Sequence, residues 1–288
     1  MLTIILDWTN EIPTWLLGLL LLAGALVVAF AGHTLRSRGD RRRKATGSAL
    51  ATDNQEGYIV SGVLGLLALM MGFTLAMAVD RFDARRSLVL QEANAIGTTY
   101  LRAQLLDEPH RARISKLLVD YTDNRIVLAR AKRGENAKLL ADNDRMITDL
   151  WSATAAAFET ISDLDFSTAF IDTVNEVINL DTARKTSRLA HVPTAVLVVL
   201  SIYVVATGGV MGYVLTGFRG QVAGSFLITL LIVCLAVIVD LERPTVGGIV
   251  ESQAPIELLR ESLENQPPEV FDRWRSAQSQ VTPAQTGR

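Results

Sequence analysis

Residues 59–79 read IVSGVLGLLALMMGFTLAMAV, and residues 80–106 continue as DRFDARRSLVLQEANAIGTTYLRAQLL. The first part is 21 uncharged residues, enough to cross a hydrocarbon core about 30 Å thick at about 1.5 Å per residue. No proline lies between Pro13 and Pro109, so nothing in the sequence forces the helix to stop at the membrane surface. In the second part, Val89, Ala93 and Ile96 begin a stripe with helical spacing. The stretch therefore predicts a spanning helix that continues into a soluble domain as an amphipathic helix.

The composition fits a membrane protein with a sizeable soluble part. The 288 residues are 49% hydrophobic, yet 20% are charged, and the net charge is −2. The N-terminal run MLTIILDWTNEIPTW has no basic region and carries Asp7 and Glu11, so it does not resemble a secretory signal. The other apolar runs predict three further spans: Ile12–Ala31, Val192–Leu215 and Ala223–Val239. Thr216–Val222 is expected to be a short turn between the last two.

A basic segment follows the first span. The link His33–Gly57 opens with RSRGDRRRK, whose basic residues are Arg36, Arg38, Arg41, Arg42, Arg43 and Lys44. Next to a membrane span, such a cluster is typical of a topology signal and an anchor for lipid headgroups. Nucleic-acid binding fits this position poorly, so we expect membrane lipid and no nucleic acid as partners.

Between the second and third spans, the sequence predicts an antiparallel helical bundle. Three further amphipathic segments follow Pro109: His110–Arg133, Asn136–Ser162 and Ser167–Arg188. A last short amphipathic helix is expected at Pro255–Leu263, and the chain turns polar after Pro267.

The predicted fold is thus an all-α membrane protein with four transmembrane helices (2+2) and a helical-bundle soluble domain inserted between spans two and three. The expected divisions are 1–57 (first span and basic link), 58–106 (second span and its amphipathic extension), 107–191 (soluble domain), 192–240 (spans three and four) and 241–288 (tail, partly disordered).

The second span has two distinguishable faces. Leu69, Phe73 and Met77 are spaced four residues apart and lie near one line of a helix. In a symmetric oligomer, such a line could form apolar rings that gate a pore by dewetting. The same side chains would also suit packing against neighbouring spans or contact with lipid. Small residues could allow close helix packing: Gly62, Gly65 and Gly72.

Several charged residues directly follow this span. Arg81, Arg85 and Arg86 could form basic rings that concentrate anions at a pore mouth, or could simply anchor the helix at the interface. Asp80 and Asp240, at the ends of spans two and four, could pair with Arg81 or Arg243. No span carries an ionisable residue at mid-depth, which argues against a proton-coupled carrier.

We expect no enzyme, no metal site and no cofactor. Cys234 is the single cysteine, and His33, His110 and His191 are far apart in sequence. The sequence has no glycine-rich phosphate loop and no cluster of a nucleophile with a base. Glu92 and Asn94, on the helical extension, are expected to form hydrogen bonds within the soluble bundle.

The run from Phe73 to Leu106, and the later segment DLERP…GG…SQAP at residues 240–255, resemble the bacterial bestrophin-like family. The resemblance covers nearly the whole chain. It is more distant to bestrophins proper, through the shared order of two spans, a helical soluble region and two spans, and through Asp80-Arg81-Phe82 followed by Arg85 or Arg86.

The resemblance implies an oligomeric anion channel. Bestrophins are pentamers whose second spans line a hydrophobic neck, with soluble domains in the cytoplasm. It would put the neck at Leu69 and Phe73, with Gly65 one turn further in, and would make inorganic anions the transported ligands. The acidic calcium clasp of bestrophins, after the fourth span, has no counterpart here, so calcium gating is not implied.

Basic residues near the span ends do not decide the orientation. Seven lysine and arginine residues would lie on the cytoplasmic side if the soluble domain were external, and seven if it were cytoplasmic. The resemblance favours a cytoplasmic soluble domain, with the spans in the inner membrane. The alternative function is a membrane-anchored sensor or interaction protein, whose helical bundle binds a ligand or a partner and whose spans transport nothing.

Overall fold

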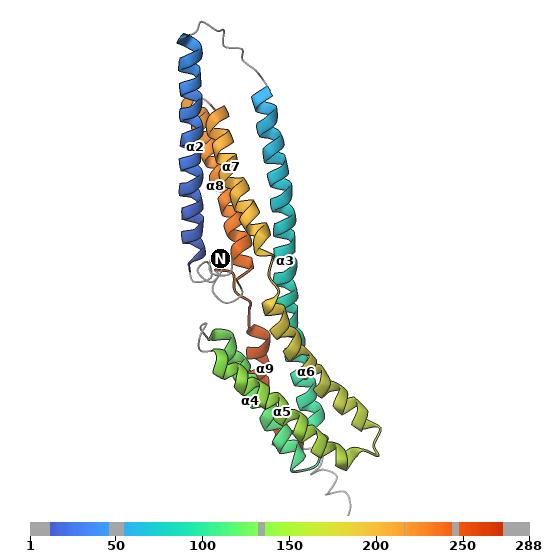
Figure 1. Cartoon of the computed structure of the whole chain (residues 1–288). Coiled ribbons are helices and arrows are strands. Elements are labelled where there is room, and N and C mark those ends of the chain that lie inside the picture. Colours follow the sequence, from blue (N-terminus) through green and yellow to red (C-terminus); the bar gives the residue numbers. More distant parts are fainter. Residues whose placement is uncertain (1–11, 46–54, 132–135, 216, 244–247, 273–288) are drawn as a thin grey trace, which may run out of the picture. The chain divides into compact units, whose positions relative to one another are not determined.

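The computed structural model describes residues 12–45, 55–131, 136–215, 217–243 and 248–272. Within these ranges the chain is helical and contains no strand (Figure 1). The helices in chain order are α2 (Thr14–Ala45), α3 (Gln55–Ala103), α4 (His110–Arg130), α5 (Asn136–Ile161), α6 (Phe166–Leu189), α7 (Thr194–Val214), α8 (Gly217–Leu241) and α9 (Ala254–Asn265), followed by the short 3-10 helix η1 (Pro268–Asp272). The predicted all-α class is confirmed. The N-terminal run with Asp7 and Glu11 lies outside the described residues. Of the polar tail expected from Pro267 onward, residues 268–272 form η1, and the residues after 272 lie outside the described ranges.

Four helical segments are long and apolar enough to cross a membrane, and they lie in α2, α3, α7 and α8. The chain divides into two compact units. Unit 1 comprises Met1–Phe82 and Ala190–Val250, and unit 2 comprises Asp83–Leu189 and Glu251–Arg288. Unit 1 therefore contains the four spans, and unit 2 contains the helices inserted between spans two and three.

The core of unit 1 consists of apolar side chains from all four spans. Its buried members include Ala25 of α2, Leu67 and Met71 of α3, Leu200 and Val204 of α7, and Ile228, Ile232 and Leu235 of α8. Large apolar side chains such as Trp15, Phe30, Ile202 and Phe226 are exposed on the same unit. An apolar exterior around an apolar core is what a bilayer requires, because lipid tails replace water as the solvent.

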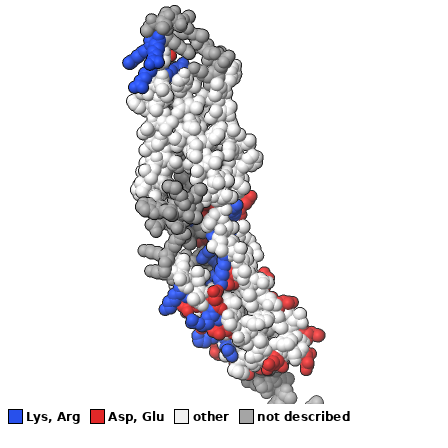
Figure 2. Space-filling view, viewed as in Figure 1, with Lys and Arg blue, Asp and Glu red and all other residues white. Residues whose placement is uncertain are grey.

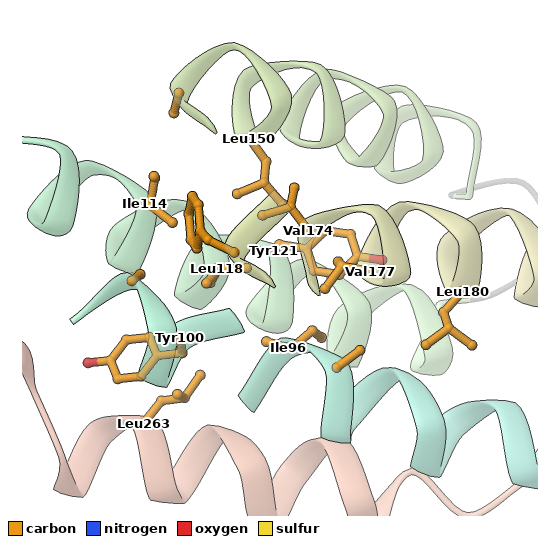
Figure 3. Packing of buried hydrophobic residues seen from close by; sticks show 14 of the residues in the cluster. Ile96, Tyr100, Ile114, Leu118, Tyr121, Leu150, Val174, Val177, Leu180 and Leu263 are labelled. Atoms are coloured by element: carbon orange, nitrogen blue, oxygen red, sulfur yellow. The ribbon is translucent and has the colours of Figure 1, made fainter. Parts of the chain in front are cut away.

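Unit 2 has a hydrophobic core of the kind found in soluble bundles (Figure 3). The amphipathic stripe of α3 contributes Val89, Ile96 and Tyr100, all buried. Side chains from α4, α5, α6 and α9 pack against it: Ile114, Leu118, Tyr121, Leu150, Val174, Val177, Leu180 and Leu263. The stripe predicted from the spacing of residues 89–103 is thus the face that α3 buries.

Two helix boundaries differ by more than three residues from those expected. The first span does not end at Ala31, because α2 continues to Ala45 and takes most of the basic segment into the helix. Arginine favours helices and no proline interrupts the run, so the helix outlasts its apolar part. The helix of the last span begins at Gly217 rather than Ala223, so the prediction of a turn is wrong for residues 217–222. Gly217 has a positive φ of 74°, which glycine adopts without steric cost.

Candidate functional site

The spanning part of α3 buries one face within unit 1 and exposes the other. The buried face carries Leu67, Met71, Thr74 and Ala78. On the opposite side, the exposed fractions are 56% for Leu69, 64% for Phe73 and 42% for Met77. The three predicted constriction residues therefore share one exposed line of a single helix, and their role in a pore stays a prediction.

Gly62, Gly65 and Gly72 lie on this exposed side. A Cβ atom built on any of them would meet no described atom within 4 Å, so these glycines serve no helix packing within the part of the chain that the structure describes. Their predicted packing role can apply only to contacts with another molecule, for which the exposed face of α3 leaves room.

Close helix packing within unit 1 occurs instead between α2 and α7. A Cβ on Gly32 would lie 2.3 Å from the carbonyl oxygen of Gly209, and one on Gly212 would lie 2.0 Å from that of Ala29. These glycines were not among the predicted packing residues. The spacing of glycines in span three could have predicted this packing. Gly212 lies four residues after Gly208 and three after Gly209, so the three lie close together on the helix.

Charged residues at the end of this apolar run are tied into unit 1. The Nη1 atom of Arg81 lies 3.7 Å from Oε2 of the buried Glu242, which also accepts a hydrogen bond of 2.6 Å from the backbone N–H of Val192. Asp80 and Asp240 were expected to pair with Arg81 or Arg243. Glu242 rather than either aspartate lies beside Arg81, whereas Asp240 does interact electrostatically with Arg243. Asp240 accepts hydrogen bonds from Thr14 Oγ1 (3.0 Å) and from the backbone N–H of Ile249 (2.8 Å).

Arg85 belongs to unit 2 and is buried. Its Nε atom lies 2.9 Å from Oε1 of Glu251, which is buried as well. Arg86, the next residue, is exposed. Of the three arginines predicted for a pore mouth, one is therefore buried in an ion pair, one is partly exposed beside Glu242, and only Arg86 extends freely from the surface of its unit.

A second polar feature is a buried cluster of charges in unit 2. Glu92 of α3 is fully buried. Its carboxylate accepts a hydrogen bond of 2.6 Å from the Tyr121 hydroxyl and lies 3.0 Å from Nε of Arg125. Arg184 of α6 also donates to it through Nη1. Because an isolated buried charge is costly, these contacts explain how α3 can carry a carboxylate in its apolar stripe.

The cluster extends to Asp181 of α6. The Asp181 carboxylate accepts a hydrogen bond of 2.9 Å from Asn143 Nδ2 and lies 3.5 Å from Nη1 of Arg125. Four helices thus contribute to one network, and we call Glu92, Tyr121, Arg125, Asn143, Asp181 and Arg184 the buried charge cluster. The expected hydrogen bonding of Glu92 within the bundle is present, whereas Asn94 is exposed.

Burial raises the pKa of the Tyr121 phenol well above its usual range, and the neighbouring Glu92 carboxylate raises it further. Tyr121 therefore stays a neutral hydrogen-bond donor to Glu92. Among the described residues, no group of three or more histidine, cysteine, aspartate or glutamate side chains could hold a metal ion.

Comparisons with known proteins identify the family and the fold. A family model described as the bestrophin-like domain matches residues 19–256. No curated protein sequence matches the chain. Crystal structures of a bacterial bestrophin homologue from Klebsiella pneumoniae have the same fold, although their sequences are only distantly similar.

One of these structures, a point variant, has a TM-score of 0.64 at 14% identity and covers 88% of this chain and 97% of the other. Another variant has a TM-score of 0.66 at 14% identity, with 85% and 98% covered. The structure phased with zinc has a TM-score of 0.64 at 15% identity, with 86% and 97% covered. The family model spans most of the sequence. The chain therefore belongs to the bestrophin-like family.

Proposed function

We propose that this protein is a homo-oligomeric ion channel whose pore is lined by the exposed face of α3. The observation that carries the proposal is the line of Leu69, Phe73 and Met77, which is exposed although the other face of the same helix is packed into unit 1. In a ring of identical chains, each such residue repeats as an apolar ring, and apolar rings gate by dewetting. The resemblance to bestrophins favours a pentamer.

The small residues on this face support an oligomer. Gly62, Gly65 and Gly72 leave space for a neighbouring copy to approach closely. In the later part of α3, four exposed residues in the same helical phase are polar: Ser87, Gln91, Asn94 and Thr98. Ala84 is an apolar exception in that phase. A face that is apolar along the membrane-spanning part and largely polar beyond it suits a conduction path with a hydrophobic constriction.

The proposal includes an orientation. We place the spans in the inner membrane with unit 2 in the cytoplasm, as the resemblance implies. The first test is the oligomeric mass of the purified protein together with ion flux from liposomes that contain it. A ring-sized oligomer with flux is the expected result. A monomer or dimer without flux would contradict the channel and favour the membrane-anchored sensor or interaction protein.

A residue-level test uses Phe73→Ala. Removing the phenyl rings widens and wets the constriction, so basal flux should rise several-fold. Phe226→Ala is a matched control, because Phe226 is also a phenylalanine on a span and is 65% exposed, compared with 64% for Phe73. Phe226→Ala should leave flux unchanged. Equal flux in the wild type and both variants, with oligomers intact, would rule out Phe73 as the constriction.

A further inference from the structure

Asp80 lies on the same exposed line as the proposed constriction. It directly follows the apolar run and is exposed in unit 1. At 3.6 residues per turn, a residue seven positions after Phe73 points within about 20° of it, whereas Asp83 points about 80° away and Arg86 about 140° away. Among the charged residues that follow this span, Asp80 is therefore the one aligned with Leu69 and Phe73.

The other charges at this end of unit 1 have partners within the chain. Arg81 lies beside Glu242, Arg243 donates a hydrogen bond of 2.7 Å to the backbone oxygen of Ile12, and Asp240 accepts from Thr14 and from backbone N–H groups. Asp80 makes no hydrogen bond or ion pair with any residue in the described part of the chain. Within the described residues, nothing therefore competes for its carboxylate.

We propose that the Asp80 carboxylates of the assembled chains form an acidic ring at the pore mouth and make the channel favour cations over anions. The inference rests on the proposed function, since it needs α3 to line the pore. Rings of aspartate or glutamate attract cations and repel anions at such positions, and an apolar neck beside the ring strengthens the field. Of the basic residues expected to form rings, Arg85 is buried and Arg81 lies beside Glu242. Arg86 is exposed but points about 140° away from Phe73 on the helix.

The test is the reversal potential in planar bilayers or liposomes under a potassium chloride gradient, with the wild-type protein and the variant Asp80→Asn. The wild type should favour potassium. In Asp80→Asn, the ratio of potassium to chloride permeability should fall by about tenfold, at the low end of the ion enrichment that charged clefts produce. Asp80→Glu should restore the wild-type ratio because the charge returns.

Asp83→Asn is the matched control, since it removes the same charge three residues later on another side of the helix. It should change the permeability ratio much less than Asp80→Asn. A chloride-selective wild type, or an Asp80→Asn channel with an unchanged ratio and intact oligomers, would overturn the acidic ring while the proposed channel stands. No flux from either the wild type or Phe73→Ala would overturn the channel, and the acidic ring with it.

Discussion

Glu92 places a negative charge in the interior of unit 2. Its fully buried carboxylate lies between Arg125 and Arg184, which are buried themselves. In Glu92→Gln, two guanidinium groups keep their charge while a main compensating charge is gone. Breaking a buried ion pair from one side costs about 3–5 kcal/mol, so the free energy of unfolding should fall by that order.

Thermal or chemical denaturation in detergent measures this change. Glu176→Gln provides the control, because Glu176 is an exposed residue of α6 and exposed substitutions usually stay within about 0.5 kcal/mol. Equal stability of the two variants would mean that the buried charge cluster contributes no net stabilisation.

Tyr121 should make the stability of unit 2 depend on alkaline pH. Its pKa is raised in the folded state, chiefly by burial and also by Glu92. The contribution to stability is therefore complete below the pKa of the unfolded chain, about 10, and is lost as pH rises above it. The loss should approach about 1.4 kcal/mol per pH unit until the folded-state pKa is reached.

Measuring the free energy of unfolding of the wild type and of Tyr121→Phe at a series of pH values isolates this effect. The variant lacks the hydrogen bond to Glu92, so it should be less stable at neutral pH and should lose less stability between neutral and alkaline pH. Parallel pH profiles for the two proteins would show that Tyr121 ionises normally.

At the scale of single residues, the sequence predicts which residues share a helix face better than it predicts which residues interact across the fold. The spacing of Leu69, Phe73 and Met77 was enough to predict that they share a face. The burial of Arg85 was not predictable, because its partner Glu251 is 166 positions away in the chain. Likewise Glu92 sits visibly inside an apolar stripe, but only the fold brings Arg125 and Arg184 to it.

At the scale of helices, the packing of α2 against α7 depends on backbone contact at glycines. A methyl group on Gly212 would lie 2.0 Å from the backbone oxygen of Ala29, and no side-chain rotation relieves a clash with a backbone atom. Gly212→Ala should therefore separate the helices and destabilise unit 1 by about 1–3 kcal/mol or more. The melting temperature in detergent measures the loss.

Gly72→Ala is the comparison for this prediction. Its new methyl group would meet no described atom within 4 Å, and alanine favours a helix over glycine by up to about 1 kcal/mol. The fold of the single chain should therefore tolerate it. If Gly72→Ala instead lowers the oligomeric mass, that residue packs against another copy, in agreement with the predicted role of the α3 glycines.

The sequence predicts which segments form helices more reliably than it predicts where each helix ends. Apolar length identified the four spans, since a bilayer requires about 20 apolar residues of any helix that crosses it. The end of α2 was not marked in the same way, because arginines are compatible with both a helix and a polar link. Its continuation to Ala45 follows from helix propensity once the apolar core has fixed the preceding turns.

At the scale of the whole molecule, the number of spans constrains the orientation. Each crossing reverses the side of the membrane, so the basic end of α2 and the inserted helices of unit 2 lie on opposite sides when α3 crosses between them. Basic residues near the span ends balance in number. We expect unit 2 in the cytoplasm, which requires the basic end of α2 to face outward; described Lys and Arg residues are blue in Figure 2.

Cysteine labelling decides this orientation, because the chain contains a single cysteine, Cys234. On a Cys234→Ala background, Arg38→Cys and Asp172→Cys introduce one thiol each at exposed positions of α2 and α6. A membrane-impermeant maleimide added to intact spheroplasts should label Arg38→Cys, and should reach Asp172→Cys only after permeabilisation. The reverse pattern would put unit 2 outside the cell. It would mean that the arginines of α2 act as the dominant cytoplasmic anchor, and that the cytoplasmic vestibule implied by the bestrophin resemblance does not apply to this chain.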